Sequence, residues 1–433
     1  MSSRFLFTCW PFEGHVFPQM AIATALDRHG HEVAFYTAPA ARRFIEPEGF
    51  HLFPFEAVEE SHYLRVLDAE RRTNGRRQSL RIQHQALRRW LVESIPGQVS
   101  DLEAIIDDWR PDALLTDLAM WGTITILWES VPIPVALSST FMGPLIPGPD
   151  APAWGFGLPP PRTVRARAAT GALTKATELA GLGLRRRVNA IRAEHGLEPL
   201  GMSMNAFSAR LPLYLVGNLP ELDYDRRDLP RSVHYLGPLQ WHPPEEPGTK
   251  AWLDAVPSDR PWVHVTEGTS HYQDPFLLKA AAIGLAGEPL EAILTTGGKR
   301  DPASIVAAPA ANVHVTRWLS HGELLPRCAA VVTTGGPATI MAALVAGVPL
   351  VVVPTTWDKP DNARRVVEAG VGIRLAPKRC TPERLRDAVR EVLLDRAYAA
   401  RARQAAKNLA VAPGPDGAVQ LLEELVGNHV PTG

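Results

Sequence analysis

Two glycines and two polar side chains near the C-terminal end of the chain could hold a phosphate. The segment 331–362 predicts a strand, a turn at Gly335 and Gly336, a helix, a second strand, and a loop that carries Asp358 and Asn362. Backbone N–H groups at a helix N-terminus that follows a parallel strand bind anionic phosphates well. A glycine pair alone is weak evidence, because many turns need glycine only for a positive φ. The polar second loop favours a ligand that bears a diphosphate.

A histidine and an aspartate could form an acid–base pair in the N-terminal half. His15 lies in the loop WPFEGHVFP, which follows a predicted strand over 4–9, and Asp117 ends the predicted strand 113–117. In open parallel sheets the carboxyl ends of the strands line one crevice, so these two side chains could face one another. The loop has no GxGxxG pattern, and a dinucleotide is therefore not expected here.

Alternating strands and helices must position these residues. The N-terminal half predicts helices over 19–28 and 121–129 and further strands over 32–37 and 134–138. The C-terminal half predicts strands over 262–266, 290–295 and 312–316 and helices over 276–285 and 319–328. This order indicates an α/β fold with two Rossmann-like, doubly wound parallel-sheet domains that face each other across a cleft.

The length of the chain also predicts two domains. At 433 residues it exceeds the size at which a single core stops growing. A proline-rich, charged stretch after residue 239 is typical of a linker. We therefore expect an N-terminal domain over 1–240, a linker over 241–260, a C-terminal domain over 261–410, and a final helix over 411–433 that could pack back on the first domain.

Composition excludes several classes of protein. The 45 basic and 46 acidic side chains nearly cancel, which gives no reason to expect a nucleic-acid partner. The three cysteines match no zinc or disulfide pattern and fit a reducing cytosol, so we expect a cytoplasmic protein. The first apolar run is too short for a signal peptide, and no apolar stretch is long enough to span a membrane. The sequence does not decide between monomer and homodimer.

Four other segments need an interpretation. Residues 59–98 predict amphipathic helix and residues 144–161 a loop rich in proline and glycine; either an acceptor pocket or a solvated lid fits them. The run Arg185 to Arg187 predicts a solvated helix face. The DxD sequence Asp223-Tyr224-Asp225 predicts a solvated turn, because it does not follow the relevant strand.

Four separated segments resemble one known family. They are WPFEGHVFP, WLSHGELLPRC from Trp318, TTGGPATIMAALVAGVP, and PTTWDKPDNA. In order and spacing they look like the family 1, UDP-glycosyltransferase-like enzymes of the GT-B fold, especially the bacterial natural-product members. The resemblance spans nearly the whole chain. It implies an inverting glycosyltransferase that moves a hexose from a UDP- or dTDP-sugar to a hydroxyl of a small hydrophobic molecule, without a cofactor or a metal.

The resemblance also assigns roles to individual residues. His15 matches the family's general base, and Asp117 matches the carboxylate that orients it. Histidine suits such a role because its ordinary pKa lies near neutrality. Trp318 matches the aromatic side chain that stacks on the nucleotide base. The residues that match the family's diphosphate site are Thr269, Gly335, Gly336 and Thr339. Those that match its sugar and ribose contacts are Asp358 and Asn362.

Two donor-binding positions depart from the family pattern. Thr334 stands where the family usually has a histidine, so a hydroxyl replaces a group that can carry positive charge. Lys359 stands where a glutamine commonly follows the sugar-binding acid, and its ammonium favours a charged sugar or a different hydroxyl pattern. Leu319-Ser320 also replaces the usual Pro-Gln.

These departures keep other functions open. The first alternative is a noncatalytic glycosyltransferase-like protein that stabilises a partner enzyme, against which the presence of both His15 and Asp117 argues. A sugar-nucleotide epimerase would need groups that deprotonate the sugar ring, and none is identified. An NAD-dependent oxidoreductase lacks its fingerprint here. The acceptor, the sugar and the nucleotide are not decided by the sequence, nor is the choice among O-, N- and C-glycosylation.

Overall fold

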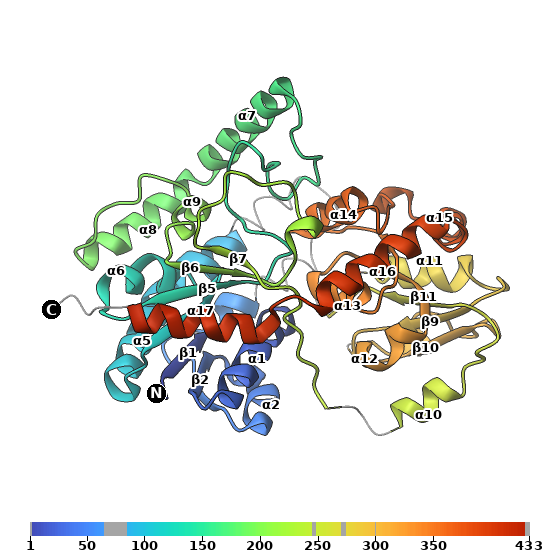
Figure 1. The fold of residues 1–433 in the computed structure, drawn as a ribbon, viewed down its shortest axis with the longest axis horizontal. Coiled ribbons are helices and arrows are strands. Elements are labelled where there is room, and N and C mark those ends of the chain that lie inside the picture. Colours follow the sequence, from blue (N-terminus) through green and yellow to red (C-terminus); the bar gives the residue numbers. More distant parts are fainter. Residues whose placement is uncertain (1, 65–84, 245–247, 270–273, 299, 429–433) are drawn as a thin grey trace.

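The computed structural model describes residues 2–64, 85–244, 248–269, 274–298 and 300–428. Figure 1 shows two α/β domains side by side, each with a twisted sheet between layers of helices. Within the described residues, all strand pairs of both sheets are parallel. The predicted fold class of two Rossmann-like parallel-sheet domains is confirmed.

The described part of the N-terminal domain holds a seven-stranded sheet in the order β3-β2-β1-β4-β5-β6-β7. The strand order reverses between β1 and β4, which lie side by side with Thr8 opposite Thr116. Such a reversal opens a crevice at the carboxyl ends of the two strands. The strands are β1 Arg4–Thr8, β2 Glu32–Thr37, β3 His51–Pro54, β4 Ala113–Asp117, β5 Val135–Ser139, β6 Leu213–Val216 and β7 Val233–Tyr235.

In the described part of the C-terminal domain, six strands follow the order β10-β9-β8-β11-β12-β13. Its order reverses between β8 and β11, where Thr266 lies opposite Thr333. A second crevice is therefore expected beyond these two strand ends. The strands are β8 Trp262–Thr266, β9 Glu291–Thr295, β10 Val313–Thr316, β11 Cys328–Thr333, β12 Leu350–Val352 and β13 Gly372–Arg374.

Helices cover both faces of each sheet (Figure 1). In the N-terminal domain, the helices whose bounds lie within the described residues are α1 Glu13–Arg28, α2 Arg42–Ile45, α5 Ile95–Trp109, α6 Trp128–Ser130, α7 Val164–Ala180, α8 Leu182–Glu194 and α9 Met204–Ser208. Those that follow are α10 Thr249–Asp254, α11 Phe276–Gly284, α12 His321–Leu324, α13 Pro337–Val345, α14 Lys359–Glu368, α15 Pro382–Leu394, α16 Arg396–Ala410 and α17 Gly414–Asn428. Among the described residues, no helix combines the length and the apolar composition needed to cross a membrane.

The central strands are apolar because helices bury both of their faces. Successive side chains of β1 point to opposite sides of the sheet, as the period of a strand requires. Phe5 and Phe7 belong to one core, whereas Leu6 belongs to the other, where it joins Leu102 of α5. Each face of this sheet therefore has its own hydrophobic core.

The last described helix returns to the N-terminal domain. Ala418, Val419 and Leu422 of α17 are fully buried in the same core as Phe5 and Phe7. Three side-chain contacts join α17 to the N-terminal domain: Arg28 Nη2 lies 3.0 Å and His29 Nε2 3.4 Å from Asp416 Oδ1, and His31 Nε2 lies 3.0 Å from Glu423 Oε1. The chain thus crosses between the two domains again after α16 (Figure 1).

Several element boundaries differ from the expected ones. Helix α1 begins at Glu13 rather than at residue 19, because Pro18 removes only one helical hydrogen bond and does not end the helix. The helix expected over 319–328 ends as α12 at Leu324 and continues as a 3-10 turn, since Pro326 restricts the residue before it. The helix expected over 121–129 is confirmed, since residues 121–130 are helical, but a π-helical turn, Thr123–Leu127, interrupts it before α6.

The expected linker is partly helical, whereas the expected loop 144–161 is confirmed. The stretch 241–260 includes α10, whose Leu253 is fully buried in the C-terminal core. The loop 144–161 contains neither helix nor strand. In the segment 59–98, residues 65–84 lie outside the described residues, and a π-helical turn spans Arg88–Glu93.

Candidate functional site

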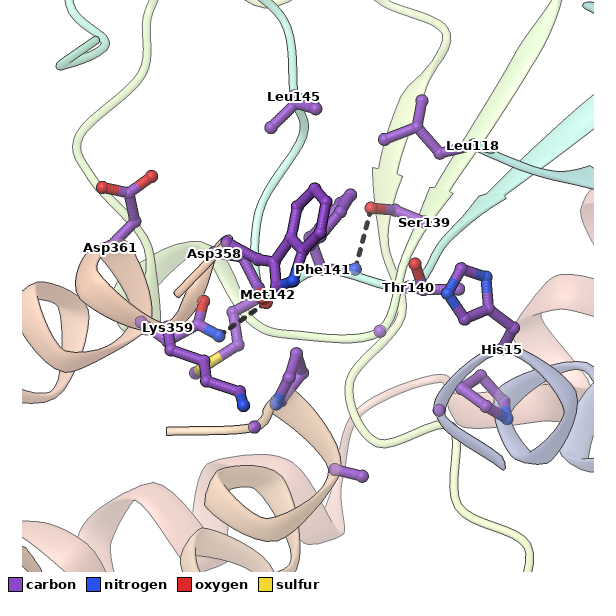
Figure 2. Close-up of a pocket in the computed structure, with 18 of the residues that line it drawn as sticks. His15, Leu118, Ser139, Thr140, Phe141, Met142, Leu145, Asp358, Lys359 and Asp361 are labelled. Atoms are coloured by element: carbon purple, nitrogen blue, oxygen red, sulfur yellow. Dashed lines mark hydrogen bonds between the residues drawn. The ribbon is translucent and has the colours of Figure 1, made fainter. Parts of the chain in front are cut away.

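A cavity of about 810 Å³ is lined by residues from both domains. In Figure 2 the His15 side chain lies on one side of this space, and Asp358 and Lys359 lie on the other. Of the residues expected to bind substrate, Asp117 and Gly335 are not among the lining residues, but each contacts a residue that is. The lining residues among them are His15, Thr269, Trp318, Thr334, Gly336, Thr339, Asp358, Lys359 and Asn362.

His15 and Asp117 are in direct contact where the strand order of the first sheet reverses. His15 Nδ1 lies 2.9 Å from Asp117 Oδ2. His15 occupies the first turn of α1, just after β1, whereas Asp117 is the last residue of the neighbouring strand β4. The expectation placed His15 in a loop; the early start of α1 gives it a fixed backbone instead, with its N–H bonded to the carbonyl of Phe12 at 2.8 Å.

The surroundings of Asp117 determine which histidine nitrogen carries the proton. Asp117 is fully buried, and its carboxylate accepts backbone N–H bonds from Trp10 at 3.1 Å and from Ala119 at 2.6 Å. An ionised carboxylate can only accept, so His15 Nδ1 must donate to it. This arrangement leaves Nε2 of His15 as an acceptor. Because the side chain of His15 is 18% exposed, that nitrogen is open to a ligand in the cavity.

Aromatic rings surround the imidazole. The rings of Phe12 and Trp90 meet the His15 ring edge-on, with centroids 5.5 and 6.2 Å away. Trp90 in turn meets Trp357 of the C-terminal domain at 6.5 Å. Such a wall favours an apolar ligand and limits the access of water to the imidazole. Further aromatic lining residues are Phe17, Trp121, Phe141, Trp154 and Trp241.

The glycine turn lies where the strand order of the second sheet reverses. Gly335 has φ 96°, a conformation that side chains rarely adopt, and Gly336 caps α13. Pro337 is the first residue of this helix, a position where its missing N–H costs nothing. The first N–H groups of a helix have no partner within it. The N-terminus of α13 at the cavity wall is thus suited to bind an anion.

Asn362 was expected in a loop, but it lies on α14, where it joins the glycine turn to Asp358, the N-cap of that helix. Its side-chain nitrogen donates to Asp358 Oδ2 at 2.8 Å and to the carbonyl of Gly335 at 2.9 Å. Its Oδ1 is buried and has no hydrogen-bond partner within the described residues. Burial raises the pKa of Asp358 to about 6, while the bond from Asn362 and the charge of Lys359 act in the opposite direction.

The hydroxyl of Thr334 is bonded to Glu267, whose carboxyl group also belongs to the site. Its hydroxyl donates to the carbonyl of Glu267 at 3.0 Å, so the proton that could have replaced the family's histidine is already used. Glu267 itself lines the cavity and accepts the N–H of Leu277 at 2.9 Å. Burial raises the pKa of this carboxyl to about 7. The one local signal for Glu267 is its position directly after β8.

The expectation of a solvated turn at Asp223-Tyr224-Asp225 is wrong for its first two residues. The side chain of Asp223 is 1% exposed and lies 2.6 Å from Nε of Arg365 on α14. Tyr235 also donates its hydroxyl to Asp223 at 2.6 Å, and Tyr224 is buried beneath the Arg365 guanidinium. Only Asp225 is exposed, at 82% of its side chain. An arginine 142 positions away neutralises Asp223, and local sequence does not reveal such a partner.

The arginine run is also not uniformly solvated. Arg186 and Arg187 of α8 are exposed, as expected, but Arg185 is half-buried and lines the cavity. Residues of α7 approach the same wall, so the arm formed by α7 and α8 takes part in the pocket (Figure 1). A helix period alone cannot show which side of an exposed helix faces a cleft.

The family model, the relatives and the solved structures that match this chain agree with one another. Residues 290–425 match the family model described as erythromycin biosynthesis protein CIII-like, C-terminal domain. The chain is 33% identical to 4'-demethylrebeccamycin synthase of Lentzea aerocolonigenes, over 98% of this chain and 100% of that protein. Among solved structures, the glycotransferase of kitacinnamycin has a TM-score of 0.74 at 23% identity, covering 98% of this chain and 99% of that one. The glycosyltransferase VinC in complex with DTDP has a TM-score of 0.70 at 20% identity, with 98% and 99% covered.

Proposed function

Because this chain belongs to the family 1, UDP-glycosyltransferase-like enzymes of the GT-B fold and of the bacterial natural-product type, we propose that it is an inverting hexosyltransferase. The donor is a UDP- or dTDP-hexose, and the acceptor is a hydroxyl of a largely apolar natural product. The observation that carries the proposal is the His15–Asp117 pair, which shares one cavity with the N-terminus of α13.

The chemistry is a single in-line displacement. The acceptor oxygen forms a bond to the anomeric carbon as the bond from that carbon to the diphosphate oxygen breaks, and the leaving nucleoside diphosphate takes the electron pair. Nε2 of His15 takes the proton of the hydroxyl. Asp117 holds the imidazole in the required tautomer and stabilises the imidazolium, as the carboxylate of a catalytic triad does. A base held in this way contributes roughly 10²- to 10⁴-fold to the rate.

The C-terminal domain binds the donor in this proposal. The diphosphate lies at the N-terminus of α13, near Gly336 and Thr339, where helix N–H groups offset the negative charge of the leaving group. Thr269 contacts the diphosphate, Trp318 stacks on the base, and Asp358 accepts hydrogen bonds from sugar hydroxyls. Gly335, Thr334, Lys359 and Asn362 complete the donor site. The proposal assigns no metal ion to the reaction.

Two relatives support the choice of substrates. The name of 4'-demethylrebeccamycin synthase, the relative at 33% identity, points to natural-product biosynthesis. VinC was crystallised with DTDP, which supports a dTDP-sugar beside the UDP-sugar option. The aromatic lining near His15 supports an apolar acceptor. The comparisons give no support to a noncatalytic auxiliary protein.

The experiment screens the purified protein against UDP- and dTDP-sugars together with a panel of polyphenols and polyketides, and mass spectrometry detects the products. We expect transfer to at least one hydroxyl compound. His15→Ala should retain donor binding while transfer falls by at least about a hundredfold. A wild-type protein that neither transfers sugar nor slowly releases free nucleotide would favour the auxiliary alternative, and unchanged turnover in His15→Ala would exclude His15 as the base.

A further inference from the structure

A buried carboxylate beside the donor residues turns toward the N-terminal domain. Asp361 lies on α14, one residue before Asn362, and is 3% exposed. In Figure 2 its carboxylate points away from Asp358 and Lys359. Its two oxygens accept the backbone N–H groups of two glycines of the 144–161 loop: Gly155 at 2.6 Å and Gly157 at 2.7 Å. None of the roles assigned so far uses Asp361.

The loop is shaped for this contact. Gly155 has φ 85° and Gly157 has φ 60°, so both adopt the left-handed conformation that turns their N–H groups toward one carboxylate. A Cβ at Gly157 would lie 2.6 Å from the carbonyl oxygen of Pro360. The carbonyl of Gly157 also accepts a bond from Arg374 Nη1 at 2.9 Å. Donor and acceptor groups of this glycine are therefore both bound by the C-terminal domain.

The same loop forms part of the cavity wall. Ala151, Pro152, Ala153 and Trp154 line the cavity, immediately before the two glycines. The ring of Trp154 meets that of Phe141 at 6.1 Å. Trp357, which precedes the α14 cap, has φ 62°, and its carbonyl oxygen lies close to Gly155. A non-glycine residue in this conformation costs about 1–3 kcal/mol and is retained where the surrounding structure requires it.

We propose that Asp361 is a positioning residue for the acceptor: by binding Gly155 and Gly157 it holds residues 151–157 in place as the acceptor wall. This inference rests on the proposed function and deepens it. The helix that presents Asp358 and Asn362 to the donor thereby also sets the shape of the acceptor side. Loss of the carboxylate frees the wall without touching the donor residues.

The test compares four single variants and one double variant with the wild type. Asp361→Ala removes both acceptors, and Asp361→Asn keeps one. Gly157→Ala disturbs the same contact from the loop side. Glu368→Gln is the matched control, because Glu368 lies on the same helix and binds Arg162, just beyond the same loop, at 2.7 Å in an exposed pair. Exposed pairs contribute little, so this variant should behave as the wild type does.

Two measurements are independent of turnover. Hydrogen exchange of the amides in 154–158 should be at least about tenfold faster in Asp361→Ala and unchanged in Glu368→Gln. Binding of alizarin, a planar hydroxyl-bearing aromatic probe, should weaken at least about tenfold, whereas the Kd for dTDP or UDP should stay within about twofold. Asp361→Asn should bind alizarin with intermediate affinity. The double variant Asp361→Ala with Gly157→Ala should bind it about as weakly as Asp361→Ala alone, because the contact that Gly157→Ala disturbs is already lost in Asp361→Ala.

The outcomes separate this proposal from the proposed function. Unchanged exchange in Asp361→Ala would show that the carboxylate does not hold the loop. Faster exchange with unchanged alizarin binding, or an equal loss of nucleotide and alizarin affinity, would reduce Asp361 to a structural role. If the wild type binds neither alizarin nor any compound of the acceptor panel, the cavity is not an acceptor site and both proposals are wrong. Binding without sugar transfer would contradict the proposed function alone.

Discussion

Replacement of Asp117 by asparagine tests the acid–base pair with almost no change in volume. In the wild type the carboxylate accepts three N–H groups: Nδ1 of His15 and the backbone groups of Trp10 and Ala119. An asparagine has one oxygen to accept them and one NH₂ group that cannot. At least one buried backbone N–H must therefore lose its partner or face another donor.

The contacts favour one orientation of the amide. The bond to Ala119 is the shortest of the three, at 2.6 Å, so the asparagine oxygen should stay there. Its NH₂ group then faces His15 and Trp10, donates to Nδ1, and forces the proton of the imidazole onto Nε2. An imidazole with a proton on Nε2 cannot accept one from the acceptor hydroxyl. The rate should fall on the order of 10⁴-fold, the loss known for the same change in a catalytic triad.

The free energy of unfolding should fall by less than the free energy that corresponds to the loss of rate. One unsatisfied buried N–H, that of Trp10, costs about 1–3 kcal/mol. Asp101 provides a matched control, because its carboxylate also accepts three bonds, from Tyr36 at 2.8 Å and from the backbone of Glu56 at 3.0 Å and Ala57 at 2.9 Å. Asp101→Asn should lower the free energy of unfolding by less than this, because its bonds to Glu56 and Ala57 are exposed and water can replace them, and it should leave the rate nearly unchanged.

The assay is single-turnover transfer at saturating donor and acceptor, followed by quantification of the glycosylated product, with chemical denaturation in parallel. Saturation removes effects on binding from the comparison. If Asp117→Asn transfers sugar within a few-fold of the wild type while losing stability, Asp117 supports the fold alone. If Asp101→Asn loses as much rate as Asp117→Asn, the loss reflects general destabilisation and the tautomer argument fails.

Three further predictions concern the donor side and the contact between the domains. The affinity for an intact nucleotide sugar should fall by up to about tenfold per pH unit as the pH drops below about 6, because burial raises the pKa of Asp358 to about 6 and only its ionised form accepts at both oxygens. Calorimetric titration on either side of that pH should show no such dependence in Asp358→Asn, and equal slopes would contradict the role of Asp358. Asp223→Ala leaves the buried guanidinium of Arg365 unpaired and should lower the free energy of unfolding by about 3–5 kcal/mol in chemical denaturation. Asp225→Ala, at an exposed position, should change it by less than about 0.5 kcal/mol. Similar losses in the two variants would refute the buried pair. Gly335→Ala should lower the free energy of unfolding by about 1–3 kcal/mol, since the φ of Gly335 is 96° and the added Cβ would lie 3.0 Å from Val352 Cγ1. Gly336→Ala, with open space around its Cβ, should retain stability and lose nucleotide affinity. Unfolding curves and nucleotide titrations distinguish the two variants.

Local sequence pattern was sufficient for the architecture. Strands such as Trp262–Thr266 and Ala113–Asp117 are short apolar runs bounded by turns, and their boundaries follow directly from that pattern. The glycine turn before α13 and the position of Asp117 at a strand end are equally local features. Parallel sheets place strand ends together at the point of reversal, so even the meeting of His15 with Asp117 could be expected from order alone.

Features that depend on partners distant in the chain needed the tertiary structure. Asp223 was expected in a solvated turn, but Arg365 of the other domain lies against it. Asp361 was expected in a loop, but it lies on α14 and accepts two glycine N–H groups from a distant loop. The hydroxyl of Thr334 is likewise used by the carbonyl of Glu267, 67 positions away. Sequence patterns are periodic over a few residues and therefore report which face of an element is buried. Which polar group meets which depends on how distant loops, strands and the two domains pack, and only the tertiary structure decides that.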